Sequence, residues 1–452
     1  MVKGKNTNSD LMEKITALAR SRGFVFPGSE IYGGLANSYD LGPLGIELKR
    51  NIKNLWWKTF VHERADIFGM DANVIMSTLI WEASGHLKNF NDLLLECKGC
   101  HTRYRADELE TEECVNCGGK EFTKPAQFNT MFKTNLGPVE SKENTVYLRP
   151  ETAQAMFVDF PEIQRTTRAK LPFGIAQIGK VFRNEITPGN FIFRLREFEQ
   201  MEIEYFIAPP ESKGDWEKHF EAWLGEIRRW NKMVGIDSKL VEEVDISAKE
   251  RAHYSERTVD IEFKYPFGQK ELYGLAYRTN YDLKAHQKQS GKTLTYKDLK
   301  TGREVLPHVI EPSFGVERTM LAVLISAYFE QEITSAKGEK DTRVVMRFPK
   351  EIAPYKVAIL PLSDKPELIK VAAKIRDELK GHFSLDYDVT QSIGKRYRRQ
   401  DEIGTPYCVT VDFDSLEDKK VTVRDRDTME QERIGINKLG EHLEDKLGLQ
   451  KQ

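Results

Sequence analysis

Alternating apolar and polar residues predict a pair of β-strands near the middle of the chain. The first ends at residues 179–185 (GKVFRNE), and the second spans residues 198–205 (FEQMEIEY). Because successive side chains of a strand point to opposite faces, Arg183 and Glu185 share one face. One face of the second strand carries Phe198, Gln200, Glu202 and Glu204. Carboxylates, an arginine and a flat ring suit a nucleotide together with a cationic group, although a hairpin with its polar face in water has the same pattern.

Helical spacing predicts a long helix that begins near Pro43, after the glycine-rich residues 28–45. Proline is favoured in the first turn of a helix. An aromatic stripe of this kind is typical either of a core or of a contact between subunits. The stripe is formed by Leu44, Leu48, Ile52, Leu55, Trp56, Trp57 and Phe60.

Two further helix starts carry charged residues. Residues 149–154 (RPETAQ) lead from a strand into a helix, where the helix dipole favours the carboxylate of Glu151. Residues 309–318 (VIEPSFGVER) lead into an apolar helix over residues 320–329. Arg318 either forms an ordinary ion pair at this helix start or points its guanidinium back at the sheet.

The apolar pattern predicts two domains. We expect the first over residues 1–349, with an inserted segment at about 209–310 that contains a lysine-rich exposed loop at 284–300. Over residues 350–452, short apolar strands alternate with helices, which predicts a small α/β domain. Its strands are expected at residues 357–360, 407–411 and 421–423, and its helices at 365–380 and 437–447.

A basic stretch lies between the elements of this second domain, within residues 393–406. Cations around an aromatic ring suit contact with the phosphates and bases of RNA, although a solvated basic loop has the same composition. The residues concerned are Lys395, Arg396, Tyr397, Arg398 and Arg399.

The composition is that of an ordinary soluble globular protein, because 40% of the 452 residues are apolar and 31% are charged. No run approaches the roughly 18 apolar residues that a membrane helix needs. The first residues, MVKGKNTN, lack the apolar core of a signal peptide, so we expect a cytoplasmic protein. A formal net charge of -2 means that only local clusters can bind nucleic acid.

Four of the five cysteines form two CxxC motifs, Cys97 with Cys100 and Cys114 with Cys117. Two such pairs complete the closed tetrahedral shell of a structural zinc ion, and four thiolates leave no open position for catalysis. The interval, at about residues 96–120, is poor in apolar residues, so the metal replaces a core. Cys408, in an apolar run, is expected to be buried.

Several segments, in their order along the chain, resemble motifs of the class II aminoacyl-tRNA synthetases. The helix at residues 42–60, the hairpin at 182–185 (FRNE) and the turn at 315–318 (GVER) resemble motifs 1, 2 and 3. More particular segments resemble the dimeric glycyl-tRNA synthetases: NSYDLGPLG (37–45), RPETAQ (149–154), REFEQME (196–202) and EPSFG (311–315).

The resemblance spans essentially the whole chain and implies an α+β fold. An antiparallel sheet flanked by helices would carry a zinc-knuckle insertion, and a C-terminal α/β domain would bind the anticodon. Motif 1 would form a homodimer interface. The activity implied is that of a glycine–tRNA ligase, which uses ATP with Mg²⁺ to form glycyl-adenylate and then transfers glycine to the 3′ end of tRNA(Gly).

The resemblance also implies roles for the ATP site. Arg183 would grip the α-phosphate and Glu185 would accept the adenine amino group, while Phe198 and Arg318 would hold the ring from opposite sides. Glu271 would hold magnesium. The implied catalytic residues are Arg183, Glu185 and Arg318. The implied ATP-binding residues are Arg183, Asn184, Glu185, Phe193, Arg194, Leu195, Arg196, Glu197, Phe198, Glu271, Leu272, Gly315, Val316, Glu317 and Arg318.

Glycine offers no side chain to recognise, so the resemblance implies carboxylates around its ammonium group: Glu151, Glu202 and Glu311, with Ser313 beside them. Steric overlap would exclude alanine without a separate editing step. The implied glycine-binding residues are Arg105, Glu151, Phe198, Glu199, Gln200, Met201, Glu202, Glu311, Pro312, Ser313, Phe314 and Gly315.

One position departs from the expected pattern, since Tyr277 stands where a smaller polar residue is expected. A catalytically inactive, synthetase-like RNA-binding or accessory subunit is the alternative to an enzyme. Such a subunit has no need of the residues implied for the chemistry, yet the chain keeps Arg183, Glu185, Glu271 and Arg318. Their presence favours the enzyme.

Overall fold

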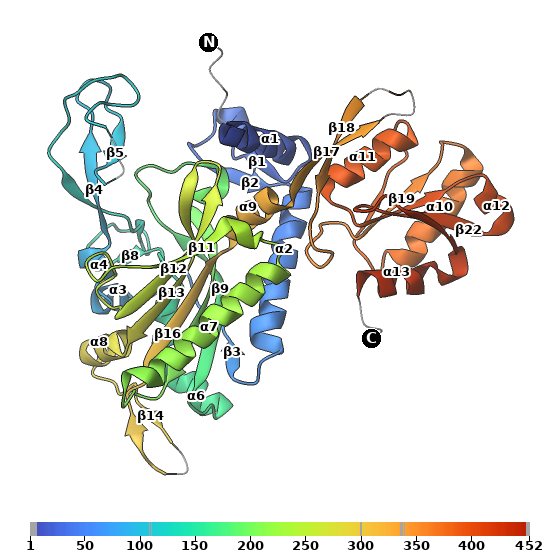
Figure 1. Ribbon diagram of the computed structural model, residues 1–452. Coiled ribbons are helices and arrows are strands. Elements are labelled where there is room, and N and C mark those ends of the chain that lie inside the picture. Colours follow the sequence, from blue (N-terminus) through green and yellow to red (C-terminus); the bar gives the residue numbers. More distant parts are fainter. Residues whose placement is uncertain are drawn as a thin grey trace.

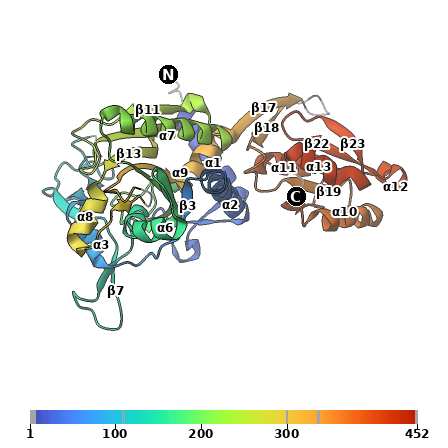
Figure 2. The same ribbon diagram turned by 90° about the horizontal axis from the view of Figure 1, so that it is seen from below.

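Two bodies make up the part of the chain that the structure describes. The computed structural model describes residues 7–107, 109, 111–298, 301–334, 338 and 340–448. A large body surrounds a seven-stranded sheet, and a smaller α/β body follows it in the chain. The two lie side by side, joined by a strand hairpin (Figures 1 and 2). No helix of the described residues is long and apolar enough to cross a membrane.

The central sheet is antiparallel except where β3 runs parallel to β9. In β10, Gln200 lies opposite Gly179 of β9 on one side and Gly315 of β16 on the other. Three strands come from residues 209–310, so this segment forms part of the sheet. In spatial order the strands are β11 (Val241–Asp245), β12 (Arg257–Tyr265), β13 (Gly268–Thr279), β16 (His308–Gly315), β10 (Glu197–Ile207), β9 (Phe173–Phe182) and β3 (Ile67–Gly69).

Helices α7 (Lys213–Met233) and α9 (Val316–Ala327) pack on one face of this sheet, and α2 (Pro43–Trp57) packs against α9 (Figure 1). Met201 and Ile203 of β10 point into this core. The predicted stripe of α2 is confirmed as core, because Leu48, Ile52 and Trp56 are fully buried. The first helix, α1 (Thr7–Ser21), adds Ile15 and Ala19 to the same core.

The opposite face is covered by α5 (Ala153–Val158), α6 (Phe160–Thr167) and α8 (Tyr281–Ser290), around a second core. The prediction of an exposed loop at residues 284–300 is wrong for its first part, which belongs to α8. This helix buries Leu283 and His286 on one side. Tertiary burial of one face stabilises a helix even where its sequence pattern is weak. Residues 299 and 300 of this prediction lie outside the described residues.

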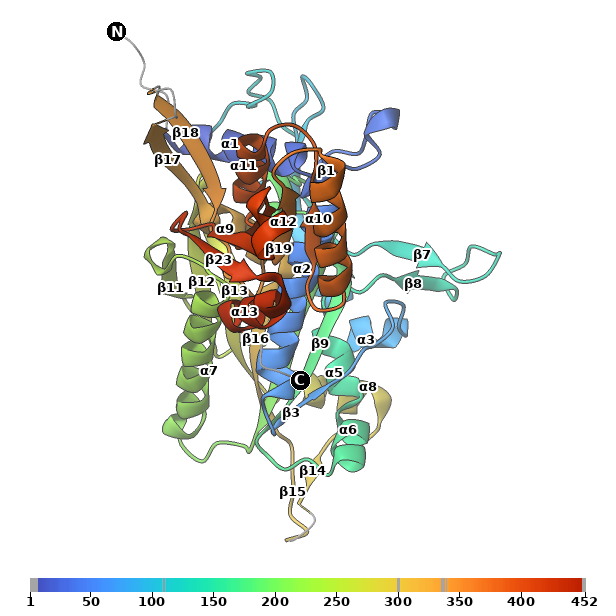
Figure 3. The same cartoon turned by 90° about the vertical axis from the view of Figure 1, so that its right-hand side faces the viewer.

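The cysteine motifs lie in loops of a small sheet that projects from the large body (Figure 1). Its order is β5 (Arg103–Arg105), β4 (Asn91–Glu96) and β6 (Ala126–Asn129). The hairpin of β7 (Lys133–Asn135) and β8 (Thr145–Tyr147) also projects (Figure 3). The remaining elements of the large body are β1 (Val25–Pro27), β2 (Tyr39–Leu41), α3 (Thr78–Ala83), α4 (His86–Asn89), β14 (Tyr296–Lys297) and β15 (Glu304–Val305).

The smaller body contains a five-stranded sheet reached through the hairpin of β17 (Tyr328–Thr334) and β18 (Lys340–Met346). The order is β20 (Leu385–Tyr387), β19 (Val357–Pro361), β21 (Tyr407–Val411), β22 (Lys420–Asp425) and β23 (Gln431–Gly435), with α10 (Pro366–Leu379), α11 (Ile393–Ile403), α12 (Asp414–Asp418) and α13 (Leu439–Leu447) around it. The small α/β domain predicted from the alternation is therefore present.

Ion pairs hold α11 of the smaller body in place against the connecting hairpin and the large body. Arg343 of β18 donates to Asp401 of α11 at 2.7 Å, and Arg424 of β22 holds the same carboxylate at 3.0 Å. Arg22, which follows α1, pairs with Glu402 of α11. These contacts fix α11 against the large body.

Candidate active site

A cavity of about 330 Å³ opens over the polar face of the central sheet. It is lined by β10, β13 and β16, by the start of α9, and by the loops that precede β10 and β12. Phe198, Gln200 and Glu202 of β10 face it because side chains alternate along a strand. Arg183 and Glu185 also reach it, although they follow β9 and do not belong to the strand.

Arg183 lies at one wall of this cavity, held by its surroundings. Its Nε donates to the backbone carbonyl of Pro150 at 3.0 Å, and its guanidinium lies 5.4 Å from the ring centroids of both Phe90 and Phe198. Nearby, burial raises the pKa of Glu185 against the opposing charges of Arg183 and Arg194. The Oε2 atom of Glu185 is buried without a donor among the described residues. A buried polar atom of this kind requires a hydrogen-bond partner.

A second arginine enters from the first turn of α9. Arg318 Nη1 donates to Oε2 of Glu271 in β13 at 2.9 Å, and its guanidinium lies 4.7 Å from the ring centroid of Phe193. The charge of Arg318 lowers the pKa of Glu271. Beside this pair, burial and the charge of Glu271 raise the pKa of Asp260 to about 7. Two carboxylates and an arginine therefore meet at this end of the cavity.

Three glutamates from separate elements converge at the other end. Glu202 accepts hydrogen bonds from the Thr152 amide at 3.0 Å and from the Ser313 hydroxyl at 2.7 Å. Glu311 of β16 accepts two hydrogen bonds from Arg278, at 2.9 and 3.0 Å. Burial and the neighbouring carboxylates raise the pKa of Glu311 to about 8, against the effect of this arginine.

Glu151 completes this group from the segment before α5. It lies 3.2 Å from Nε2 of His86 and accepts a hydrogen bond from Gln154 at 2.8 Å. Burial opposes its ionisation, but the charges of His86 and Arg278 outweigh burial and lower its pKa. The cluster is rich in carboxylates, so it suits a small cation.

Glu204 lies next along the same face of β10. It is fully buried, and neither carboxyl oxygen has a partner among the described residues. Burial and the adjacent Glu311 raise its pKa well above the usual value of a glutamate. Its surroundings therefore oppose its ionisation.

The cavity brings together most of the predicted site residues. Those lining it are Glu151, Arg183, Glu185, Phe193, Arg194, Leu195, Phe198, Gln200, Glu202, Glu271, Leu272, Glu311, Ser313, Gly315, Glu317 and Arg318. The others that the resemblance implied do not line it. They are Arg105, Asn184, Arg196, Glu197, Glu199, Met201, Pro312, Phe314 and Val316.

Strand alternation explains the placement of those that lie on β10 and β16. Glu199 points to the opposite side of β10, where it pairs with Lys49 and Lys53. Met201 and Phe314 are fully buried in the core. Arg105, on the small projecting sheet, pairs with Asp107 at 2.8 Å.

Several residues that line the cavity were not predicted from the sequence. The most polar are Glu250, Arg251, Tyr254, Thr258 and Asp260, from the loop before β12 and from β12 itself. The alternation of polar and apolar residues in β12 places Thr258 and Asp260 on one face, a signal that was available in the sequence. The loop had no such signal.

Tyr277, the residue that departs from the expected pattern, lies outside the cavity. It is buried, stacks on Trp216 with ring centroids 4.2 Å apart, and shares a 2.6 Å hydrogen bond with His308. Its side chain therefore packs against α7, while the next residue, Arg278, points to Glu311.

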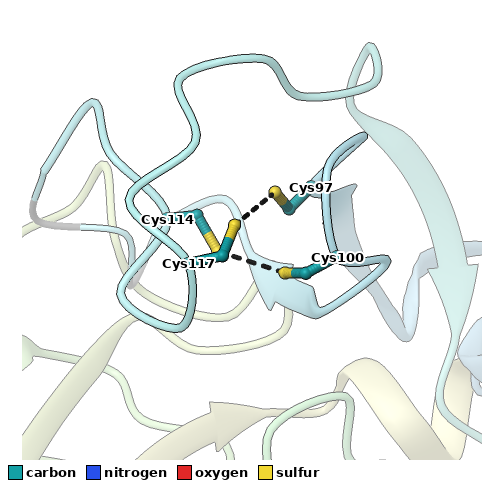
Figure 4. Close-up of side chains that lie close together, drawn as sticks. All are labelled: Cys97, Cys100, Cys114 and Cys117. Atoms are coloured by element: carbon teal, nitrogen blue, oxygen red, sulfur yellow. Dashed lines mark hydrogen bonds between the residues drawn. The ribbon is translucent and has the colours of Figure 1, made fainter.

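The four cysteines of the two CxxC motifs converge, as the sequence predicted (Figure 4). Their sulfur atoms all lie within 4.8 Å of one another, with Cys100 and Cys114 at 3.5 Å and Cys97 and Cys117 at 3.7 Å. Four thiolates at this spacing fit the tetrahedral shell of a zinc ion. Cys408 is buried apart from them in the smaller body.

The basic stretch at residues 395–399 forms a helix, α11, so its interpretation as a loop is wrong. Arg396 is only 1% exposed and donates to the backbone carbonyls of Pro361 and Leu362, at 2.5 and 3.2 Å. Tyr397 hydrogen-bonds to Thr410. Arg398 pairs with Asp341 and Arg399 with Asp388, whereas Lys395 is exposed. The cations that the pattern assigned to RNA thus serve in part to hold the helix in place.

Two family models match the chain. Residues 132–327 match the class II tRNA synthetase core domain (G, H, P, S and T), and residues 356–446 match the anticodon binding domain. With its antiparallel sheet, its cavity of arginines and carboxylates, and this second domain, the chain is a class II aminoacyl-tRNA synthetase.

Curated relatives cover nearly all of the chain. A glycine–tRNA ligase of Geobacillus thermodenitrificans is 51% identical over 96% of this chain and 97% of its own. Those of Geobacillus kaustophilus and Caldanaerobacter subterraneus subsp. tengcongensis are 51% and 50% identical over 96% of this chain, and over 99% and 98% of theirs. The chain belongs to the glycine–tRNA ligase family.

Proposed function

We propose that the protein joins glycine to the 3′ end of tRNA(Gly) in two steps at this cavity. In the first, a carboxylate oxygen of glycine attacks the α-phosphorus of ATP, and diphosphate leaves. In the second, a hydroxyl of the terminal ribose of the tRNA attacks the carbonyl carbon of glycyl-adenylate. AMP leaves, and the hydroxyl proton is released.

The carboxylate end of the cavity would bind the ammonium group of glycine. Glu151, Glu202 and Glu311 would surround the ammonium group with carboxyl oxygens, and the positive charge of the ammonium group would lower the raised pKa of Glu311. Ser313 orients Glu202 through its hydroxyl. Their hydrogen bonds to Gln154, Thr152 and Arg278 support this role, because they fix each carboxylate before the substrate arrives. A pocket fixed in this way would exclude a larger amino acid by overlap.

The arginine end would bind ATP. Arg183 would contact the α-phosphate, and Arg318 would lie against the adenine ring opposite Phe198. The unpartnered Oε2 of Glu185 would accept the adenine amino group. Magnesium bound with ATP would neutralise phosphate charge, and Glu271, with Asp260 beside it, would hold the ion.

No side chain needs to act as a nucleophile in the first step, because the glycine carboxylate is already ionised. The protein would contribute position and charge: it aligns the carboxylate with the α-phosphorus, and Arg183 offsets the charge that develops there.

Further features of the proposal rest on the family and on the sequence. The catalytic domain would span residues 1–349, with insertions at about 96–120 and 209–310, and the anticodon-binding domain residues 350–452. The four cysteines would hold a structural zinc ion, and α2 would lie at the interface of a homodimer. The protein would act in the cytoplasm, and residues 395–399 would form part of its contact with tRNA.

The observation that carries the proposal is one cavity that holds a cluster of three carboxyl groups, Glu151, Glu202 and Glu311, together with Arg183 and the Arg318–Glu271 pair. Purified protein is expected to catalyse glycine-dependent exchange of labelled diphosphate into ATP, and much less exchange with alanine. The Arg183→Ala variant should lose roughly 100-fold or more in rate. Arg165→Ala, which removes an exposed arginine of α6, is the control. Absence of exchange, or equal exchange with alanine, would contradict the proposal.

A further inference from the structure

A buried ionic network lies behind one wall of the cavity. Lys49 of α2 is 8% exposed, and its Nζ lies 2.6 Å from Oε1 of Glu317 and 3.4 Å from Oε1 of Glu199. Lys53, one turn further along α2, lies 2.6 Å from the other oxygen of Glu199. Burial opposes the charge of Lys49, but the two glutamates outweigh burial and raise its pKa. The lysine is therefore a cation shared by two carboxylates.

The same network crosslinks the two elements that form the wall. The second oxygen of Glu317, in the first turn of α9, accepts the backbone N–H of Glu199 in β10 at 2.9 Å. Glu317 immediately precedes Arg318, and Glu199 immediately follows Phe198. The two groups proposed to lie on either side of adenine are thus sequence neighbours of the two glutamates that Lys49 joins.

The wall separates the active-site cavity from a second cavity of about 630 Å³. Lys49, Lys53 and Glu199 line only the second cavity, whereas Phe198 and Glu317 line both. Lys49 therefore reaches the wall from behind and does not line the active-site cavity.

We propose that Lys49 is a positioning residue for ATP, which acts through Glu317 and Glu199 to fix the separation of Arg318 and Phe198. This inference rests on the proposed ATP site. Without the ammonium group, Glu317 loses its lysine partner and Glu199 keeps only Lys53. The two largely buried carboxylates then repel one another, or one of them must take up a proton. The start of α9 then moves relative to β10, and the gap between Arg318 and Phe198 changes with it.

The test is Lys49→Gln in the full-length protein, assayed by diphosphate exchange. The KM for ATP is expected to rise by about 10- to 100-fold, since misplacement on the order of 1 Å costs up to ~100-fold. The KM for glycine should stay unchanged, because other residues hold the carboxylate end. Arg50→Gln removes a neighbouring exposed cation of α2 and is the matched control. Equal changes in both KM values would overturn the proposal, because a merely structural role affects both substrates.

Two further variants make the result decisive. Lys53 is 30% exposed at its side chain and contacts only Glu199, so Lys53→Gln should fold and raise the KM for ATP by a smaller factor. An unchanged KM for ATP in this variant would contradict the inference even if Lys49→Gln does not fold. The double variant Lys49→Gln/Glu317→Gln should have a KM for ATP no higher than that of Glu317→Gln alone. If the two substitutions instead raise the KM for ATP by factors that multiply, the inference is overturned.

Failure of this inference differs from failure of the proposed function. Arg318→Ala should raise the KM for ATP whether or not Lys49 has a positioning role. An effect of Arg318→Ala without one of Lys49→Gln would reject only the inference. No effect of either would reject the proposed ATP site itself.

Discussion

Arg318 and Glu271 form an ion pair across the active-site cavity, with Nη1 and Oε2 2.9 Å apart. The same guanidinium nitrogen also reaches the backbone carbonyl of Glu271 at 3.2 Å. The pair joins the start of α9 to the first half of β13 and leaves both charges compensated before any ligand binds. In the proposed reaction Arg318 contacts the adenine ring and Glu271 holds magnesium. Binding of ATP with magnesium must therefore replace at least part of the contact between the two residues.

Replacing Glu271 should weaken the response to magnesium. In Glu271→Gln one oxygen of the carboxylate becomes an amide nitrogen, so the side chain binds a hard cation less well. We expect the Mg²⁺ concentration for half-maximal diphosphate exchange to rise by roughly 10- to 100-fold. Glu262→Gln is the matched control, because Glu262 lies directly opposite on β12 but outside the cavity. Equal magnesium dependence in the two variants would refute the assignment of Glu271.

Removal of one cysteine ligand should release the proposed zinc ion. Elemental analysis of the parent protein is expected to give one zinc per chain, and Cys114→Ser much less, because a structural site needs its full thiolate shell. Backbone hydrogen exchange should then become faster between Cys97 and Phe122. This segment has few apolar residues, so little else stabilises it once the metal is lost.

Cys408→Ala serves as the control for the zinc measurement. This cysteine lies in the smaller body, so the variant should keep its zinc and its slow exchange around Cys97. Full zinc content in Cys114→Ser would contradict the four-cysteine site.

The buried Glu204 should make stability depend on pH. An exposed glutamate has a pKa of about 4.3, whereas burial and Glu311 raise the pKa of Glu204 in the folded protein well above that. At pH values between the pKa of the unfolded chain and the raised pKa of the folded protein, Glu204 binds fewer protons in the unfolded chain than in the folded protein. The contribution of this group to the free energy of unfolding therefore decreases as the pH rises through that window.

Glu204→Gln has a similar shape but no proton to lose. From about pH 5 to about pH 8 its free energy of unfolding in urea should fall less than that of the parent, by about 1–3 kcal/mol. Glu311, whose pKa is raised to about 8, leaves a residual dependence in both proteins. Glu417→Gln, at an exposed position of α12, is the control. An identical pH dependence in Glu204→Gln and the parent would show that Glu204 ionises normally.

Substitution of two neighbouring cations of α11 should have different effects: one should lower stability, and the other should weaken tRNA binding. Arg396 is buried and bonded to carbonyl groups, so Arg396→Ala should lower the free energy of unfolding by about 2–3 kcal/mol. Lys395 is exposed, so Lys395→Ala should leave stability unchanged and weaken tRNA binding more at low salt than at high salt. Unfolding in urea and filter binding of tRNA(Gly) measure the two effects. Tight tRNA binding by Lys395→Ala would remove this helix from the proposed interface.

Local patterns were sufficient for much of the fold. The alternation in residues 198–205 predicted β10 and its polar face, and helical spacing predicted the buried side of α2. The spacing of the cysteines predicted their cluster. Each of these signals depends on residues close together in sequence, where backbone geometry alone sets which side chains share a face.

Burial of segments rich in charged residues, in contrast, could not be predicted from the sequence alone. The lysines after Tyr281 indicated a loop, but residues Tyr281–Ser290 form helix α8, which is stabilised by the packing of its buried side. Arg396 is buried although its sequence neighbours are basic. Both outcomes depend on neighbours that come from distant parts of the chain, and their positions are set by strand order and not by local pattern.

The sequence by itself determined the two domains' types of element, the zinc-type cysteine spacing and, through a resemblance, the family. The resemblance also implied that Glu151, Glu202 and Glu311 surround one group, and the structure brings them together from different elements. Only the tertiary structure decided that Asp260 joins Glu271 and that Lys49 reaches the wall behind Arg318. The physical reason is that a site in a sheet is assembled across strands. Strand order and register bring side chains together over long sequence separations, and no local periodicity encodes that pairing.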